Sequence, residues 1–371
     1  GNTTTVPVLV TVIDPVPVVI TQDIIVELDA NGNVTITPNQ IDNGSNSVVG
    51  IANLELDNTS FNCSNIGVPV TVTLTATSTL GRTATGTATV TVLDTTAPNV
   101  ITQNIVVQLD ENGNASITPE MINNGSSDNC GIEDISLDIT NFSCNNIGNN
   151  QVTLTVKDIN GNLSNSTANV VVEDTISPTI AIQNITVPLN ENGIANFTVD
   201  MINNGTTDNC AIASLELSET SFACSNLGEN TVTFTATDVN GNVSTENVIV
   251  TVIDEIAPTV ITKNIEVYLD ASGNASITPE MVDNGSYDNC TFSLSLDTTT
   301  FSCNNTGDNI VSLIAIDASG LQTTQQTTVT VIDSILPTAI SQDVTVQLDE
   351  NGNASITPDM INNGSSDNCT F

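Results

Sequence analysis

Apolar and polar residues alternate along most of the chain, in short runs that are separated by turn residues. In positions 95–174, for example, apolar side chains recur at every second position in 105–109, 135–139, 152–156 and 168–172. Such alternation is typical of strands with one buried face. Asn112-Gly113 and Asn160-Gly161 supply turn signals between runs. The pattern predicts an all-β fold, an antiparallel sandwich of immunoglobulin type.

Three shorter features complete this expected unit. Ala115 and Ile117 continue the inward face as a second strand after the Asn-Gly turn. Thr118-Pro119-Glu120 has a capping residue followed by proline at the first helical position, which predicts one short helical turn. Phe142 is expected to fill the core. The two ends of the unit should leave it at opposite poles, as a string of such units requires.

The same pattern returns about every 80 residues, and a junction motif marks each return. The motif reads Asp94-Thr-Thr-Ala-Pro98, then Asp174-Thr-Ile-Ser-Pro178, Asp254-Glu-Ile-Ala-Pro258 and Asp333-Ser-Ile-Leu-Pro337, with a weaker copy at Asp14. Internal periodicity of this kind indicates a tandem array. We predict immunoglobulin-like repeats at 15–94, 95–174, 175–254 and 255–333.

The remaining residues match parts of the same repeat. Residues 1–14 align with 241–254, so we expect them to be the last strand of a preceding repeat. Residues 334–371 match the first half of a following repeat, and we therefore expect a protein that is longer at both ends. The short, proline-containing linkers favour an extended rod over a flexible chain of domains.

Charge narrows the possible partners. The chain has 42 acidic and three basic residues, no histidine, and a net charge of −39. A chain of this charge repels phosphate backbones and anionic membrane surfaces, so we do not expect it to bind nucleic acids or membrane surfaces. The same charge suits Ca²⁺, whose ligands are carboxylate and carbonyl oxygens. No apolar run reaches the ~20 residues that a membrane helix needs.

The eight cysteines fall at two positions of the repeat, and an even number in an extracellular protein indicates disulfides. Pairing within repeats gives Cys130–Cys144, Cys210–Cys224 and Cys290–Cys303, and leaves Cys63 and Cys369 over. Pairing between repeats gives Cys63–Cys130, Cys144–Cys210, Cys224–Cys290 and Cys303–Cys369. The strand at 134–139 carries the chain roughly 20 Å, whereas bridged α-carbons lie within about 7 Å. This favours pairing between repeats, although pairing within repeats survives if 140–144 fold back.

Aspartates recur at three positions that should meet at the junction between repeats. They are the junction residues Asp94, Asp174 and Asp254, the loop residues Asp128, Asp208 and Asp288, and the turn residues Asp158, Asp238 and Asp317. Three carboxylates at a short linker resemble a calcium site. In repeat 15–94, Ser47 and Ser78 occupy the loop and turn positions, and Val49 replaces the loop cysteine. The alternative is that these aspartates only cap turns, which is also our interpretation of Asp110-Glu-Asn-Gly-Asn114.

No catalytic machinery is evident, and we expect no enzymatic activity. Histidine is absent, the cysteines are accounted for by disulfides, and no base is placed to activate a serine or threonine. Catalysis by a carboxylate pair is formally open, but with 42 carboxylates some will be close by chance.

The segments DTTAPNVITQNIVVQLDENGNASITPEMINNGSSDNCGI and FSCNNIGNNQVTLTVKDINGN resemble HYR-like (hyalin-repeat-like) modules of giant Bacteroidetes surface proteins, including flavobacterial gliding and adhesion proteins. The resemblance covers essentially the whole chain. It implies an immunoglobulin-like fold, export by the type IX secretion system, and a role in adhesion or as a stalk. The expected location is the cell surface or the medium, with the protein anchored to the outer membrane or secreted. A further cysteine pair found in many members is absent here. O-glycosylation in this bacterial group implies candidate sites at Thr95, Thr175, Thr298 and Ser334.

Three functions compete at this point. The first is a structural stalk or filament that holds an adhesive region away from the cell, with neighbouring repeats or other filament chains as partners. The second is adhesion by the repeats themselves to glycans or surfaces, for which the chain has few aromatic residues, eight Phe and two Tyr. The third is an accessory array attached to a secreted enzyme.

Overall fold

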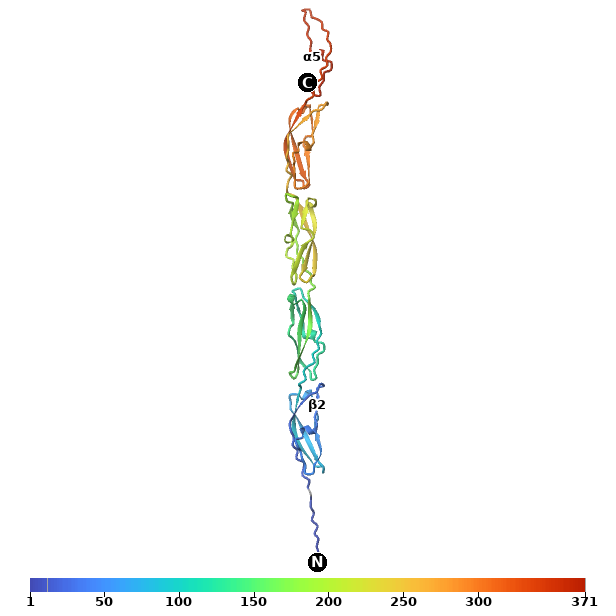
Figure 1. The fold of residues 1–371 in the computed structure, drawn as a ribbon, viewed down its shortest axis with the longest axis vertical. Coiled ribbons are helices and arrows are strands. Elements are labelled where there is room, and N and C mark those ends of the chain that lie inside the picture. The colour runs from blue at the N-terminus through green and yellow to red at the C-terminus, as the bar shows by residue number, and fades with distance from the viewer. Residues whose placement is uncertain (12, 371) are drawn as a thin grey trace. The chain divides into compact units, whose positions relative to one another are not determined.

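A computed structural model describes residues 1–11 and 13–370. Val12, within the predicted last strand of a preceding repeat, and Phe371, at the end of the predicted half repeat, lie outside the described residues. The chain divides into two compact units, Gly1–Ile176 and Ser177–Phe371. Figure 1 shows each complete repeat as its own bundle of strands.

The first unit contains the strands of two repeats. In 15–94 these are β1 (Ile24–Glu27), β2 (Asn33–Thr35), β3 (Ile51–Leu56), β4 (Ser60–Asn62), β5 (Val70–Ser78) and β6 (Thr83–Leu93), with helix α1 (Pro38–Ile41). In 95–174 they are β7 (Ile105–Gln108), β8 (Asn114–Ser116), β9 (Ile132–Leu137), β10 (Asn141–Ser143), β11 (Gly148–Asp158) and β12 (Leu163–Glu173), with α2 (Pro119–Ile122).

The second unit repeats this order twice more. Its first set is β13 (Ile185–Pro188), β14 (Ile194–Asn196), β15 (Ile212–Leu217), β16 (Ser221–Ala223), β17 (Gly228–Asp238) and β18 (Val243–Ile253), with α3 (Val199–Ile202). Its second set is β19 (Ile265–Tyr268), β20 (Asn274–Ser276), β21 (Phe292–Leu296), β22 (Thr300–Ser302), β23 (Gly307–Asp317) and β24 (Gln322–Ile332), with α4 (Pro279–Val282). Helix α5 (Pro358–Ile361) follows, and a 3₁₀ turn begins at Cys63, Cys144, Cys224 and Cys303.

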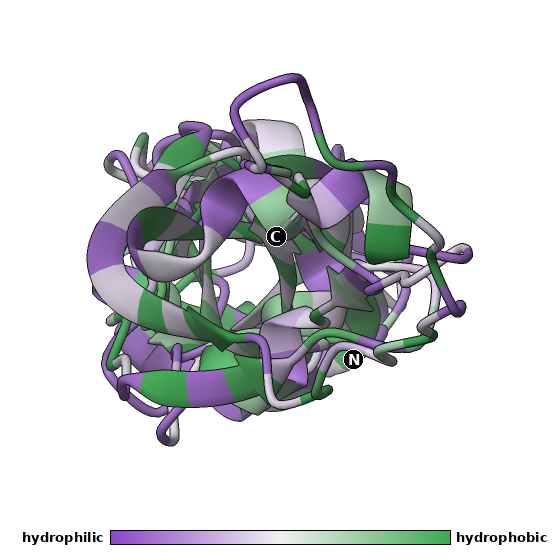
Figure 2. Cartoon of the chain, turned by 90° about the horizontal axis from the view of Figure 1, so that it is seen from above, coloured by the Kyte–Doolittle hydropathy of each residue, from purple (hydrophilic) through white to green (hydrophobic). Residues whose placement is uncertain are grey.

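Each complete repeat is a sandwich of a four-stranded and a two-stranded sheet. In 15–94 the strand orders are β1-β6-β5-β3 and β2-β4. Hydrophobic and hydrophilic residues alternate along the strands (Figure 2). Successive side chains of a strand point to opposite faces, and Val72, Leu74 and Val90 are fully buried between the sheets. Phe61 and Ile36 approach the same core from the opposite side. Phe142, expected in the core, is 3% exposed.

One part of the expected topology is wrong, because the sandwich is not entirely antiparallel. The first strand of each repeat pairs in parallel with the last, as in β1 with β6, where Ile24 lies opposite Val90. The physical reason is the position of the termini. A repeat whose chain enters at one pole and leaves at the other has first and last strands that run in the same direction, so they can pair only in parallel.

The expected third strand also ends earlier than predicted. Strand β9 stops at Leu137, and Ile139 is 39% exposed instead of continuing the inward face. The chain turns at Asp138, whose Oδ1 accepts a hydrogen bond from the Thr153 backbone N–H at 2.7 Å. A side chain that bonds to the backbone in this way competes with the strand ladder.

The segments outside the complete repeats contain no strands among their described residues. Residues 344–347 stand at the position of the first strand, which in complete repeats is held by the last strand. The hairpin-like contacts that precede this position do form, with Thr338 opposite Ser366 and Ser341 opposite Asn362. No helix in residues 1–11 and 13–370 is long and apolar enough to cross a membrane.

Candidate metal centre and the junction between repeats

Disulfides join one repeat to the next within each unit. Cys63 bonds to Cys130 in the first unit, and Cys224–Cys290 and Cys303–Cys369 form in the second, with α-carbons 5.4–5.7 Å apart. Pairing within repeats is contradicted, because each such pair loses at least one cysteine to these bonds. The cysteines that remain are Cys144 and Cys210. These two are also disulfide-bonded, and their pairing with each other stays a prediction.

A glycine lets the two repeats approach closely at each of these bonds. The backbone of Gly193 has a φ of +70°, and a Cβ there would lie 2.7 Å from Cys224 Sγ and 2.6 Å from the carbonyl oxygen of Asn289. Gly32 and Gly273 are in the same position beside the other two bonds. Only glycine combines this backbone conformation with so close a contact.

Next to two of these bonds, Cys63–Cys130 and Cys224–Cys290, the three predicted aspartates come together. In the first unit, Asp94, Asp128 and Asp158 each present a carboxylate oxygen, and these oxygens lie within 4.8 Å of one another. Asp254, Asp288 and Asp317 form the same cluster in the second unit. Strand ends position them: Asp254 follows β18, Asp317 ends β23, and Asp288 lies in the loop before β21.

In the second unit each aspartate uses one oxygen locally and leaves the other without a partner. Asp254 Oδ1 accepts from the Ile256 N–H, Asp317 Oδ1 from the Ser319 and Leu321 N–H groups, and Asp288 Oδ2 from the Cys290 N–H. The opposite oxygens, Asp254 Oδ2, Asp317 Oδ2 and Asp288 Oδ1, are buried with no hydrogen-bond partner. Asp254 and Asp317 are only 8% and 7% exposed. Turn capping therefore accounts for half of each carboxylate, and a cation would satisfy the other half.

A fourth oxygen belongs to a residue that sequence reasoning missed. Asn289 donates from Nδ2 to Asp254 Oδ1 at 3.0 Å and to the Asn190 carbonyl of the preceding repeat at 3.4 Å, while its Oδ1 is buried without a partner. Asn129 and Asn368 make the equivalent pair of bonds. The sequence did contain a hint of this role. Repeat 15–94, which lacks the loop aspartate and the loop cysteine, also has Val48 in place of this asparagine.

The surroundings of Asp288 in this cluster disfavour its ionised form. Burial, followed by the nearby Asp254 and Asp317 carboxylates, raises the pKa of Asp288 despite hydrogen bonds from the Cys290 and Asn289 backbones. Carboxylates that face one another in a dehydrated site favour either a proton or a bound cation. Because all the free donors are oxygens, the site suits a hard cation such as Ca²⁺.

The first-unit cluster is partly satisfied by amides instead. Asn160 Nδ2 donates to Asp94 Oδ2 at 2.7 Å, and Asn162 Nδ2 donates to Asp158 Oδ2 at 2.8 Å, which leaves Asp128 Oδ1 unpartnered. Ser319 and Leu321 replace these two amides in the second unit. The second-unit cluster therefore has more buried carboxylate oxygens without a hydrogen-bond partner, and a bound cation would stabilise it more than the first-unit cluster.

The remaining predicted site residues lie in turns and loops or on the exposed surface. Asp174 lies in the first unit, and Asp208 and Asp238 in the second, where each accepts backbone hydrogen bonds from its own turn. Burial opposes ionisation of Asp238, but hydrogen bonds from Asn242 and the turn backbone leave its pKa lowered. Asp110 accepts from the Asn112 and Asn114 N–H groups at 2.9 Å, which is the turn role expected for this segment. The candidate glycosylation residues Thr95, Thr175, Thr298 and Ser334 are exposed.

Repeat 15–94 has a different arrangement at its first pole. Ser78 Oγ donates to Asp14 Oδ2 at 3.0 Å, so a neutral hydroxyl stands where the other repeats have a carboxylate. Val48 and Leu80 are 86% and 67% exposed at the positions of Asn129 and Asn160. The chain therefore contains its own example of a junction without the cluster or the loop cysteine.

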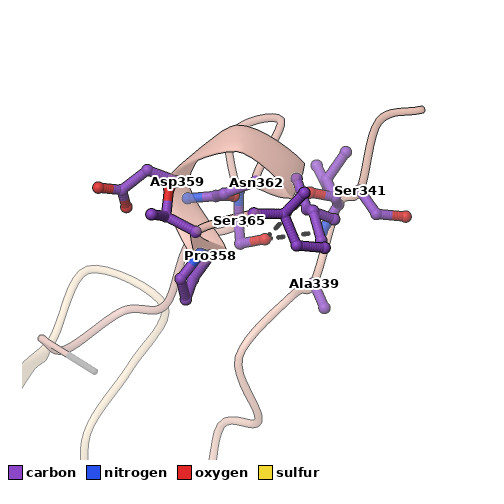
Figure 3. Close-up of a pocket in the computed structure, with 10 residues that line it drawn as sticks. Ala339, Ser341, Pro358, Asp359, Asn362 and Ser365 are labelled. Atoms are coloured by element: carbon purple, nitrogen blue, oxygen red, sulfur yellow. Dashed lines mark hydrogen bonds between the residues drawn. The ribbon is translucent and has the colours of Figure 1, made fainter. Parts of the chain in front are cut away.

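Residues 334–370 contain an apolar groove, shown in Figure 3, which we do not interpret as a ligand site. It is lined by Ile340, Ile356 and Ile361 beside Ser365, which hydrogen-bonds to Ile340. In complete repeats the residues at the positions of Ile356 and Ile361, such as Ile277 and Val282, are buried under the four-stranded sheet. The groove is the open side of an incomplete core.

No family model and no curated protein sequence matches the chain. Similar solved structures include the protocadherin gammaB4 extracellular domain (14% identity, 91% of this chain and 70% of that one, TM-score 0.29) and the human desmocollin-1 ectodomain (12%, 76% and 71%, 0.22). A titin I-band fragment, I67–I69, is similar over 64% of this chain and 99% of its own (10% identity, TM-score 0.32).

The strand order, the sheet pairing and the recurrence of both define the class of protein. The chain is a tandem array of immunoglobulin-like β-sandwich repeats.

Proposed function

We propose that this chain is a structural stalk segment of a large secreted cell-surface protein, and that it holds an adhesive region away from the cell. The observation that carries the proposal is the junction. The same disulfide, glycine and asparagine contacts recur at the 94/95, 254/255 and 333/334 junctions. Among the described residues, these specific contacts serve to hold one repeat against the next.

Two features support an extracellular location. Disulfides persist in oxidising compartments and are rare in reducing ones. A strongly acidic chain also suits a calcium-rich medium, and we propose that Ca²⁺ occupies the aspartate clusters at the junctions. The resemblance to HYR-like modules supports a Bacteroidetes surface protein exported by the type IX system.

One observation favours adhesion by the repeats themselves as a second candidate. In 15–94, threonines lie opposite one another on β5 and β6 at every second position of the pairing: Thr71–Thr89, Thr73–Thr87, Thr75–Thr85 and Thr77–Thr83. The residues between them, such as Val72 and Leu74, are buried, so the threonines lie on the outer face. An uncharged array of hydroxyl groups suits hydrogen bonding to carbohydrate hydroxyls.

Adhesion of the purified chain under flow separates the two candidates. For a stalk we expect no retention of coated beads on glass, polysaccharide or glycan surfaces, while circular dichroism shows a folded β protein. Retention that is lost on changing Thr75 and Thr85 to lysine would instead make repeat 15–94 adhesive. The matched control places lysines at Thr235 and Thr245, which pair at the same positions of repeat 175–254.

A further inference from the structure

The disulfides define a covalent path through the second unit that bypasses most of its residues. Cys224–Cys290 closes a loop with a sequence separation of 66, and Cys303–Cys369 closes another of 66. The only peptide backbone between the two bonds is the segment from Cys290 to Cys303, thirteen residues along the chain.

We propose that tension on this protein is carried from repeat to repeat by the disulfides and this short segment, so that the folded residues after Cys63 cannot lengthen the oxidised chain. The proposal rests on the stalk function, because it states how such a stalk resists stretching.

The short segment contains little that could unravel. It consists of β21, at the edge of the four-stranded sheet, and β22, which pairs with β20 in the two-stranded sheet. Both are already extended. Thirteen residues span at most about 45 Å when fully stretched, and strands already rise about 3.3 Å per residue. Little slack therefore remains between Cys290 and Cys303.

Most of the buried core of repeat 255–333 lies outside the segment from Cys290 to Cys303, which contributes Phe301. Val311, Leu313 and Val331 are buried on β23 and β24, between Cys303 and Cys369. Strands β19 and β20 lie between Cys224 and Cys290. Pulling on the ends therefore places no load on the central β23–β24 pairing, so the core is protected from mechanical unfolding as long as the bonds are oxidised.

The start of the chain provides an internal contrast. Repeat 15–94 has Val49 where the other repeats have the loop cysteine, so its first disulfide cysteine is Cys63. Strands β1 to β4 precede Cys63 and lie directly in the path of tension. This part of the repeat can unravel under force even in the oxidised chain.

Stretching the full chain from its two ends at constant force tests the proposal. In the oxidised chain we expect extension from the residues before Cys63 and no later step. Dithiothreitol donates two electrons to each disulfide, which leaves two cysteine thiols while the reagent becomes a cyclic disulfide. Each reduction should then lengthen the chain in one step of up to about 220 Å, the span of 66 released residues.

A variant with Cys224→Ser and Cys290→Ser should gain one such step without reductant, and Ser225→Ala is the matched control. A further step of this size in the oxidised wild-type chain, after the residues before Cys63 have extended, would overturn the proposal, and so would reduction that releases no length. Because retention under flow is measured separately, failure of the tension path and failure of the stalk function can be told apart.

Discussion

Replacing Cys63 and Cys130 by serine should lower the free energy of unfolding of the first unit by about 4 kcal/mol. The bond closes a loop with a sequence separation of 67, and loop-closure entropy gives roughly this value for a loop of that length. Since the loop contains β5 and β6 of one repeat and β7 and β8 of the next, its loss should also separate the unfolding of the two repeats. Denaturant titration followed by circular dichroism measures both effects.

Ser64→Ala, beside the first cysteine, is the control for this experiment. A double cysteine variant that unfolds at the same denaturant concentration as the wild type, in one transition, would show that the bond contributes nothing to the coupling of these repeats. A single Cys63→Ser variant is less informative, because it leaves a free thiol at Cys130.

Calcium should stabilise the second unit through Asp254, Asp288 and Asp317, by about 2.7 kcal/mol when free calcium is about 100 times the Kd. Tyr287 precedes Asp288 and gives a local probe, because a tyrosine sensitises the luminescence of Tb³⁺ bound nearby in place of Ca²⁺. Asp317→Ser and Asn289→Val introduce the residues found in repeat 15–94. Each should weaken Tb³⁺ binding at this site by about 10- to 100-fold.

The matched control for these variants is Asp270→Asn. It removes one negative charge, and asparagine already occupies this turn position as Asn190. If Asp270→Asn weakens Tb³⁺ luminescence as strongly as Asp317→Ser, then net charge attracts the ion and the cluster is not a specific site. Unchanged stability on adding calcium or the chelator EDTA would contradict the site altogether.

The pH dependence of this site should reverse when calcium is present. The pKa of Asp288 is raised in the folded chain above its ordinary 3.8. Without calcium, its contribution to stability is therefore full below about pH 3.8 and is lost as the pH rises through the folded pKa. Calcium binds the ionised form, so with calcium the stability of the junction should increase over the same pH range.

The fold was predictable to the extent that it depends on which side chains face inward. Alternation at Val152, Leu154 and Val156 identified buried strand faces, and all three are fully buried. Alternation does not say which strand lies beside which, so the parallel pairing of β7 with β12 was missed. The opposite positions of the termini, also expected from the sequence, make the first and last strands run in the same direction, so that any pairing between them has to be parallel.

The candidate site was predictable from its carboxylates but not from its amides. Asp254, Asp288 and Asp317 recur at fixed positions near one pole, and turn geometry brings such positions together. Asn289 was missed because asparagine is frequent throughout the chain and usually indicates a turn. Its importance depends on the carbonyl of Asn190, about a hundred residues earlier, which only the folded junction brings within reach.

The central claim is that disulfides link each repeat to the next. Peptide mapping of the oxidised chain tests this disulfide connectivity most directly. Digestion at aspartate suits a chain with only three basic residues. We expect linked peptides that contain Cys63 with Cys130, Cys224 with Cys290 and Cys303 with Cys369, and from the sequence Cys144 with Cys210. Linked peptides that contain Cys130 with Cys144, Cys210 with Cys224 and Cys290 with Cys303 would contradict both the joined repeats and the path of tension through them.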